Sequence, residues 1–406
     1  MRQHRSDGAG HHTEIDVLDF FCGCGGASLG FRDARTGRTK YRLIGGVDLD
    51  PHALATYARN LGVPALSVDI NSLSNRSAIL RMMNGTRRDP RNPLVLIGCA
   101  PCQGFSSHTK MDGDDDPRRT LIERFAQIAT ELKPDAILIE NVPELFADRN
   151  WPHFKTARDR LRKSGYNVRA RIYNFAEFGL PQERFRAVVM ALKKPFEMPV
   201  PFLAPEGFRT VRETISHLPP LNAGECDPHD PMHVTSRHRK STIELLSKVP
   251  KDGGNRPPGV GPKCLDRARG AFGGYTDVYG RLAWNRPALT ITARCRTPSC
   301  GRYAHPEQDR GLSVREAALL QGFPPDFYIE GPFDDKFKQI GNAVPPSIAK
   351  LLAEHMYNQL LTEESRQNKE RDGTDVVSSI GPGFSILING IKRRRDRIAQ
   401  TGTYGD

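Results

Sequence analysis

Short apolar runs alternate with amphipathic segments along residues 15–192, and this alternation restricts the possible folds more than any other feature of the sequence. The amphipathic segments include Leu121–Leu132 and Phe154–Lys163, where apolar residues recur with helical spacing. Continuous apolar strands separated by helices are typical of a mostly parallel, doubly wound α/β sheet. We therefore predict such a domain over residues 15–193. Its expected strands are Ile15–Phe21, Tyr41–Val47, Leu94–Gly98, Ala136–Ile139, Val168–Tyr173 and Arg186–Leu192.

The rest of the chain is expected to form a smaller, loop-rich domain with accessory segments. Proline and glycine are dense between residues 193 and 286, and regular periodicity is lost there. We predict a recognition domain over residues 194–330, with a helix that begins at the capping box of Ser313 and Glu316. The other expected segments are a disordered N-terminal tail (1–14), a segment that packs back on the α/β domain through a helix at Pro345–Leu361 (331–361) and a basic polar tail (362–406).

The formal net charge of +12 predicts a polyanionic partner for this chain. Ribosomal and membrane-surface proteins carry similar charge, so charge alone does not select among these classes. The polar N-terminus has no apolar core for a signal peptide, and no apolar run approaches the ~20 residues that a membrane-spanning helix needs. We therefore expect a cytoplasmic protein whose eight cysteines are thiols that pack, bind metal or catalyse.

A glycine-rich turn follows the first expected strand. It reads Phe21-x-Gly23-x-Gly25-Gly26 and precedes a helix, so its backbone can approach a nucleotide-like ligand closely. Ser28 stands where a dinucleotide-binding turn would have its third glycine, and such a turn alone is often only a tight turn.

Two spaced acidic residues strengthen the cofactor interpretation. Asp48 ends the second expected strand, where an acid would hold ribose hydroxyls. Asp69 follows a third apolar stretch, from which it would reach an adenine edge. No Walker-type lysine pattern is present, which argues against ATP.

The segment Gly98–Ser107 follows another expected strand, and it contains Pro101, Cys102 and Gln103. The carboxyl ends of strands carry the site in an open parallel sheet, so Cys102 is a candidate nucleophile.

Cys99-x-x-Cys102 is also compatible with half of a zinc site or with a redox pair. Cys295 and Cys300 are the only pair with nearby spacing that could complete a zinc site. A redox pair would open a helix, whereas Gly104 and two serines favour a loop.

Two further motifs place polar side chains beside strands. Glu140 ends the strand that begins at Ala136, where a carboxylic acid is a candidate proton donor or hydrogen-bond partner. In Gln182-x-Arg184-x-Arg186, alternate residues of an extended segment face the same side, so both guanidinium groups suit phosphate or carbonyl recognition. The alternative for these arginines is an exposed basic edge strand.

Taken in order, these motifs resemble the cytosine-5 DNA methyltransferases of bacterial restriction–modification systems. The resemblance covers roughly residues 15–360, because two more motifs of that family follow. The segments that carry it are Phe21–Gly26, Gly98–Ser106, Glu140–Val142, Gln182–Arg186, Arg286–Thr292 with Gly301–Glu307, and Gly341–Pro346.

The resemblance implies a catalytic mechanism. Cys102 would add to C6 of a cytosine that has been flipped out of the helix, and Glu140 would hydrogen-bond N3 and the exocyclic amine. Arg186 would hold O2, while Arg184 would contact a backbone phosphate or support the loop.

The resemblance also implies S-adenosyl-L-methionine as cofactor and double-stranded DNA as substrate. We expect a monomer, with a possible restriction endonuclease as functional and not physical partner. The implied cofactor residues are Phe21, Gly23, Gly25, Gly26, Asp48, Leu49, Asp69, Ile70, Pro101, Asn342 and Val344. The candidate DNA contacts are Gln103, Ser106, Arg237, Arg239, Lys240, Lys263, Arg267, Arg269 and Thr290, most of them on phosphate. No metal is expected.

Three residues depart from the family pattern. Phe185 occupies a slot that is often glutamate, Asp48 replaces the commoner glutamate on the ribose, and Leu49 stands where an aromatic side chain often packs on the adenine. They affect details of the cofactor pocket.

Three alternatives remain at this point. A transfer RNA methyltransferase of the same type would lack the long segment between Arg186 and Thr290. A non-catalytic DNA-binding regulator would have lost the nucleophile, the acid or the glycine turn, and all three are present. A zinc-dependent binding module is the third.

Overall fold

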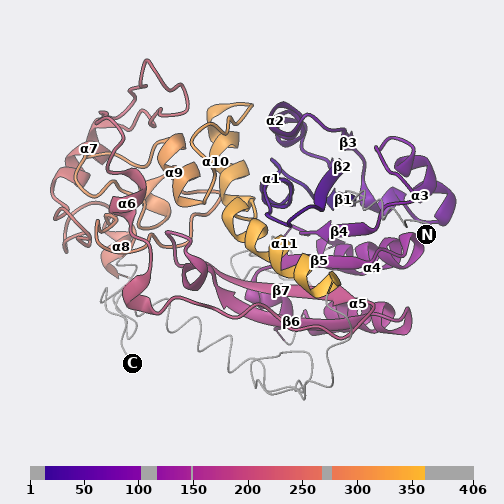
Figure 1. The fold of residues 1–406 in the computed structure, drawn as a ribbon. Helices are drawn as coiled ribbons and strands as arrows, with labels where there is room; N and C mark the ends of the chain where they lie inside the picture. The colour runs from indigo at the N-terminus through magenta and orange to yellow at the C-terminus, as the bar shows by residue number, and fades with distance from the viewer. Residues whose placement is uncertain (1–13, 102–116, 148–149, 268–276, 362–406) are drawn as a thin grey trace, which may run out of the picture.

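A seven-stranded sheet forms the centre of the larger lobe (Figure 1). The computed structural model describes residues 14–101, 117–147, 150–267 and 277–361, so both predicted tails lie almost entirely outside the described residues. The strand order is β3-β2-β1-β4-β5-β7-β6. The strands are β1 (Glu14–Phe20), β2 (Lys40–Asp48), β3 (Ala65–Ser67), β4 (Leu94–Gly98), β5 (Ala136–Asn141), β6 (Asn167–Asn174) and β7 (Phe185–Leu192).

The predicted α/β sheet is confirmed as mostly parallel, with one antiparallel strand. Strands β1 to β5 pair in parallel, whereas β7 runs antiparallel to both β5 and β6. Strand β7 thus lies between two strands that precede it in the sequence. This insertion brings the residues at the start of β7 next to the carboxyl end of β5.

Apolar side chains cover both faces of the sheet, because successive residues of a strand face opposite sides. Leu18 packs in a cluster with Phe125 of α4 and Phe154 of α5, while the neighbouring Val17 packs in a second cluster with Leu352 of α11. The helices of this lobe are α1 (Gly26–Arg32), α2 (Pro51–Leu61), α3 (Arg76–Met83), α4 (Leu121–Leu132), α5 (Trp151–Lys163) and α11 (Pro346–Leu361). The helix boundaries predicted for α4 are confirmed, and α11 begins at a proline, which a first helical turn tolerates.

The small lobe is built from short helices and long loops. Its helices are α6 (Val211–Ile215), α7 (Lys240–Ser247), α8 (Cys264–Arg267), α9 (Val314–Leu320) and α10 (Phe333–Asn342). The predicted capping box is present at the start of α9, where Ser313 and Glu316 bond to each other's backbone.

Short 3-10 helices occur in both lobes. They are η1 (Ile70–Ser72), η3 (Pro117–Thr120), η4 (Pro143–Phe146), η5 (Phe175–Phe178), η6 (Pro205–Gly207) and η7 (Pro298–Cys300).

A third apolar cluster joins the two lobes. Phe337 and Ile340 of α10 pack there with residues of α6 and α9, so α10 and α11 pack in different clusters. Cys24 and Leu29, which belong to the glycine turn and α1, also join this third cluster. The glycine turn therefore lies between the sheet and α10 (Figure 1). In the described part of the chain no helix is both long and apolar enough to cross a membrane.

Candidate active site

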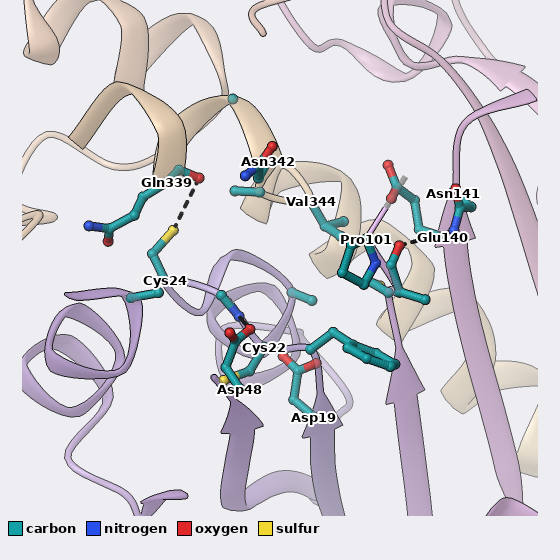
Figure 2. A pocket seen from close by; sticks show the side chains of 18 of the residues that line it. Asp19, Cys22, Cys24, Asp48, Pro101, Glu140, Asn141, Gln339, Asn342 and Val344 are labelled. Carbon is teal, nitrogen blue, oxygen red and sulfur yellow. Dashed lines mark hydrogen bonds between the residues drawn. The ribbon is translucent and has the colours of Figure 1, made fainter. Parts of the chain in front are cut away.

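A cavity of about 320 Å³ lies at the carboxyl ends of β1, β2, β4 and β5, opposite α10. Strand β1 is flanked by β2 on one side and β4 on the other, so β1 is the point at which the order of strands in the sheet reverses its direction. Ligands bind at this kind of switch point in open α/β sheets. Figure 2 shows Asp19 and Asp48 at neighbouring strand ends, with Gln339, Asn342 and Val344 across the cavity from them.

The glycine turn forms one wall of the cavity. Gly23 and Gly25 have φ angles of +53° and +93°, a left-handed backbone that glycine adopts without strain. A Cβ on Gly23 would meet no protein atom within 4 Å, so the cavity reaches its backbone. A Cβ on Gly26 would lie 2.2 Å from the carbonyl oxygen of Val344, so glycine is required for the close approach of that segment.

Asp48 braces the turn from the end of β2. Its carboxylate accepts hydrogen bonds from the backbone N–H groups of Gly23 (2.8 Å), Leu49 (2.7 Å) and Asp50 (3.0 Å). Asp48 lines the cavity, together with the predicted cofactor residues Phe21, Gly23, Pro101, Asn342 and Val344.

Five predicted cofactor residues are not among those that line this cavity: Gly25 and Gly26 of the glycine turn, and Leu49, Asp69 and Ile70. The side chain of Leu49 is 59% exposed. Asp69 is exposed and accepts a hydrogen bond from the backbone N–H of Asn71 at 2.9 Å, while Ile70 is buried in the core of the large lobe.

The thiols of Cys22, Cys24 and Cys99 line the same cavity. Burial raises the pKa of Cys24 to about 12 and the pKa of Cys99 well above its usual value. Thiols that stay protonated at neutral pH are poor nucleophiles, which agrees with packing roles for all three. Cys102, the predicted nucleophile, lies outside the described residues, as do Gln103 and Ser106.

Glu140 and Arg186 form a buried ion pair in the cavity wall. Oε1 of Glu140 lies 3.0 Å from Nε of Arg186, and the side chains are 8% and 10% exposed. No described residue donates a well-aligned hydrogen bond to this oxygen, so it retains accepting capacity toward a ligand. The adjacent Asn141 donates from Nδ2 to the carbonyl oxygen of Ala100 at 3.0 Å, which ties β5 to the segment that leads to Pro101.

Arg184 is buried and binds backbone carbonyls. Its guanidinium donates to the carbonyl oxygens of Ile291 (3.1 Å), Ala343 (3.1 Å) and Gly341 (3.3 Å). Its relative exposure of 2% excludes a phosphate contact in this conformation, so of the two predicted alternatives the structure favours support of the loop. As strand alternation predicts, Arg184 and Arg186 both line the cavity.

The Thr290 segment pairs with the Gln182 segment. Thr290 Oγ1 donates to the carbonyl oxygen of Glu183 at 2.7 Å, and the side-chain oxygen of Gln182 accepts from the N–H of Ile291 at 2.9 Å. A backbone bridge links Gln182 to Ala288. These contacts dock the small lobe onto the strand that carries Arg186.

The residues of the cavity wall that sequence reasoning missed include the polar side chains of Asp19, Asp50, Lys338 and Gln339. Nζ of Lys338 lies 2.8 Å from Oδ2 of Asp50, which joins the first turn of α2 to α10. The position of Lys338 and Gln339, one helical turn before the Asn342 motif, was the available signal.

The predicted basic contacts lie on the small lobe. Arg237, Arg239, Lys240 and Lys263 are exposed. Nζ of Lys240 lies 4.0 Å from Oε1 of Glu244, one helical turn along α7. The side chain of Arg267 and all of Arg269 lie outside the described residues. Cys295 is buried in the third apolar cluster, whereas Cys300 is exposed.

Comparison with known proteins agrees with this site. The family model for C-5 cytosine-specific DNA methylases matches residues 15–358. The chain is 32% identical over 358 residues to the Type II methylase M.HgiDII of Herpetosiphon aurantiacus, covering 86% of this chain and 97% of that protein. It is 33% identical over 343 residues to the Type II methyltransferase M1.HphI of Haemophilus parahaemolyticus, covering 84% and 86%.

A solved structure shares the fold. The methyltransferase EhMeth of Entamoeba histolytica superposes with a TM-score of 0.61 at 17% sequence identity, covering 86% of this chain and 99% of that one. The family match covers every motif of the cavity wall, from the glycine turn to Val344. The chain therefore belongs to the C-5 cytosine-specific DNA methylases, enzymes that transfer a methyl group from S-adenosylmethionine to carbon 5 of cytosine in DNA.

Proposed function

We propose that this methylase modifies a cytosine within a specific double-stranded DNA sequence, as the modification half of a restriction–modification system or as a solitary methylase. The observation that carries the proposal is the buried Glu140–Arg186 pair, which shares one cavity with the glycine turn. The Type II names of the similar bacterial proteins support the restriction–modification context. We infer that it acts as a monomer in the bacterial cytoplasm, with any cognate endonuclease as a functional partner.

The cavity fits S-adenosylmethionine. Its volume is within the range of about 300–1,000 Å³ that small-ligand pockets occupy. The open backbone at Gly23 and a buried carboxylate oxygen of Asp19 without a donor among the described residues provide polar contacts for such a molecule. The residues of the cavity wall that would hold it are Phe21, Gly23, Asp48, Pro101, Asn342 and Val344. The other residues that we propose for it are Gly25, Gly26, Leu49, Asp69 and Ile70. When bound, the cofactor supplies an electrophilic methyl group.

The chain's own residues would activate the cytosine. Carbon 5 is a weak nucleophile until the Cys102 thiolate forms a bond to C6, which shifts electron density to C5. Glu140 would hydrogen-bond N3 and the exocyclic amine and place a proton on N3, and Arg186 would hold O2. After C5 is methylated, the C5 proton passes to a base, the Cys102 thiolate departs and N3 returns its proton to Glu140, which restores the C5–C6 double bond. Arg184 would act indirectly, since it holds the segments around Ile291 and Ala343 in place.

Double-stranded DNA is the substrate that the small lobe favours. The target base is stacked inside the duplex, so it must rotate out to reach a cavity at the sheet edge. The small lobe presents the exposed side chains of Arg237, Arg239, Lys240 and Lys263, which suit a phosphate backbone. A transfer RNA substrate is the second candidate, and the experiment below separates the two.

The test of this function combines base-resolution mapping with covalent trapping. DNA from cells that express the protein is sequenced after bisulfite treatment, and the purified protein is incubated with labelled cofactor and either duplex DNA or transfer RNA. We expect methylcytosine at one recurring DNA sequence and no label in RNA. Duplex DNA with 5-fluorocytosine at the target should trap an adduct that peptide mapping places on Cys102. Label in RNA alone would overturn the proposed substrate.

Cysteine variants provide the matched control. Cys102→Ser should abolish turnover, because an alcohol is far less ionised than a thiol at neutral pH. Cys99→Ser and Cys22→Ser should retain most of the activity, since both thiols are protonated by burial. Equal loss in all three variants together with loss of bound zinc would support the metal-binding alternative instead.

A further inference from the structure

A histidine interrupts the basic run Arg237–Lys240 of the small lobe. Arg237 and Arg239 are exposed, whereas His238 between them is half-buried. Nε2 of His238 accepts a hydrogen bond from the backbone N–H of Gly311 at 3.0 Å. A Cβ on Gly311 would lie 3.2 Å from that nitrogen, so the absence of a side chain there leaves room for the imidazole ring. The histidine thus faces the protein while the arginines beside it face solvent.

Gly311 belongs to a well-connected part of the small lobe. It forms a backbone bridge with Ala304. The preceding Arg310 is buried, and its guanidinium donates to both carboxylate oxygens of Glu316 at 2.8 Å. Glu316 is part of the capping box that begins α9. His238 therefore ties the basic run to the start of α9.

The residues that precede the run are attached to the same end of α9. The backbone N–H of Arg315 donates to the carbonyl oxygen of Met232 at 2.8 Å, and the N–H of Val314 donates to the carbonyl oxygen of Val234 at 3.1 Å. His238 continues this row of contacts to within two residues of α7. The whole segment from Met232 to the first residue of α7 is thereby laid along one edge of α9 and the loop before it.

His238 has to be neutral to accept the bond from Gly311. Burial lowers the pKa of His238, and the charges of Arg296 and Arg310 lower it further. At neutral pH the ring therefore keeps the lone pair on Nε2, and Nδ1 carries the proton. The imidazole adds no charge to the run, so its contribution is to geometry.

The two arginines are held by their backbone and not by acidic partners. Neither guanidinium group has an ion pair or a hydrogen bond among the described residues. The backbone of Arg237 also lies against Gly224, where a Cβ would be 3.4 Å from the Cα of Arg237. A cation on a fixed backbone loses less conformational freedom when it binds a phosphate than a cation on a loose loop does.

We propose that His238 is a positioning residue for DNA binding, which holds Arg237 and Arg239 through its bond to Gly311 so that both reach phosphates of the duplex. The inference rests on the proposed DNA substrate, and it names the residue that prepares the surface for it. His238 acts through the arginines, because its Nε2 is occupied by Gly311.

The first part of the test compares His238→Phe with His238→Gln. Phenylalanine fills the space of the ring but leaves the Gly311 N–H without this acceptor, whereas the side-chain oxygen of glutamine can take its place. Binding of a fluorescein-labelled duplex that contains the mapped target sequence is measured by anisotropy over a salt series. We expect His238→Phe to bind about 10-fold more weakly and to lower the salt slope by about one unit or more. His238→Gln should stay within about twofold of the wild type.

The second part shows whether His238 acts through the arginines. The double variant Arg237→Ala, Arg239→Ala should weaken DNA binding, and adding His238→Phe to it should cause no further loss. His217→Phe changes an exposed histidine of the same lobe and should bind DNA as the wild type does. Affinity for S-adenosylhomocysteine should be the same in all variants, because the run lies outside the cavity wall.

An equal loss from His238→Phe in the wild-type and double-variant backgrounds would contradict the inference, because the histidine would then act independently of the arginines. Unchanged DNA affinity in His238→Phe, or failure of glutamine to restore it, would contradict it as well. If the double variant bound DNA normally while the wild type methylated duplex DNA, the inference would fail and the proposed function would stand. A wild type that labels transfer RNA alone would reject the duplex substrate and, with it, the inference.

Discussion

The Glu140–Arg186 pair is the residue-scale feature on which the chemistry depends. Glu140 is the next-to-last residue of β5, and Arg186 is the second residue of the antiparallel strand β7. The register places Glu140 opposite Val188, two residues after Arg186. Residues two apart in a strand face the same side of the sheet, so the two charged side chains lie on the same side. Burying two charges is tolerated because each partly neutralises the other, while Glu140 Oε1 stays available.

Glu140→Gln is predicted to separate chemistry from folding. The amide keeps the size of the side chain but cannot hold the proton that N3 needs. We expect kcat to fall by about 10²–10⁴-fold, with a smaller change in cofactor affinity. Steady-state kinetics on duplex DNA and calorimetry with S-adenosylhomocysteine measure the two quantities.

Glu131→Gln is the matched control for that variant. Glu131 lies on the surface of α4, 3.4 Å from Arg76, and should leave kcat unchanged. If Glu140→Gln kept more than a tenth of the wild-type kcat, the proposed role of the carboxyl group would be wrong.

At the scale of the elements, a glycine allows α10 to pack closely against the backbone of a neighbouring segment. A Cβ on Gly341, near the end of α10, would lie 2.1 Å from the carbonyl carbon of Thr292 and 2.2 Å from the nitrogen of Ala293. The helix thus packs directly against the Thr292 backbone. Arg184 reinforces this contact, because it bonds to carbonyls on both segments.

Gly341→Ala is predicted to force α10 away from that backbone. Overpacking of this kind costs roughly 1–3 kcal/mol, and the displaced helix carries Gln339 and Asn342 of the cavity wall. We expect a lower free energy of unfolding in urea together with weaker binding of S-adenosylhomocysteine.

Gly207→Ala provides the comparison for the glycine variant. Its Cβ would meet Leu203 at an ordinary 3.6 Å, and its φ is not left-handed. Both measurements should remain at wild-type values. A Gly341→Ala protein with unchanged stability and affinity would contradict the close packing described here.

At the scale of the whole molecule, a polar seam joins α2 of the large lobe to residues 328–339 of the small lobe. Thr56 Oγ1 donates to the side-chain oxygen of Gln339 at 2.6 Å and accepts from the N–H of Glu330 at 2.9 Å. Asn60 and Tyr328 exchange two hydrogen bonds, of 2.7 and 3.1 Å. Because Gln339 also lines the cavity, this seam connects lobe packing to the cofactor pocket.

Thr56→Val should weaken the seam without changing side-chain shape. It leaves the buried Gln339 oxygen and the Glu330 N–H without this partner, at a cost of about 1–3 kcal/mol. Thermal unfolding should show a lower Tm, and the affinity for S-adenosylhomocysteine should fall in parallel. Thr130→Val on α4, whose hydroxyl donates to the carbonyl oxygen of Gln127 in the same helix, should lower Tm much less. Equal effects of the two variants would show that the seam does not couple the lobes to the pocket.

Local patterns in the sequence determined the elements and the family. The strand Leu94–Gly98 and the helix Leu121–Leu132 have the predicted bounds, because each carries its own apolar periodicity. The Ser313 capping box is likewise a contact between residues close in sequence. The role of Cys102 rests on its motif and stays a prediction.

The tertiary structure decided what depends on contacts between distant residues. No local sequence pattern predicts that β7 lies between β5 and β6, yet this strand order brings Arg186 next to Glu140. Arg184 was expected near phosphate or loop, and its burial against carbonyls comes from the packing of three separate segments. Lys338 joins the cavity wall only because α10 packs on α2. Strand order and lobe docking arise from the burial of shared apolar surface, and that burial is a property of the whole chain and not of any local window.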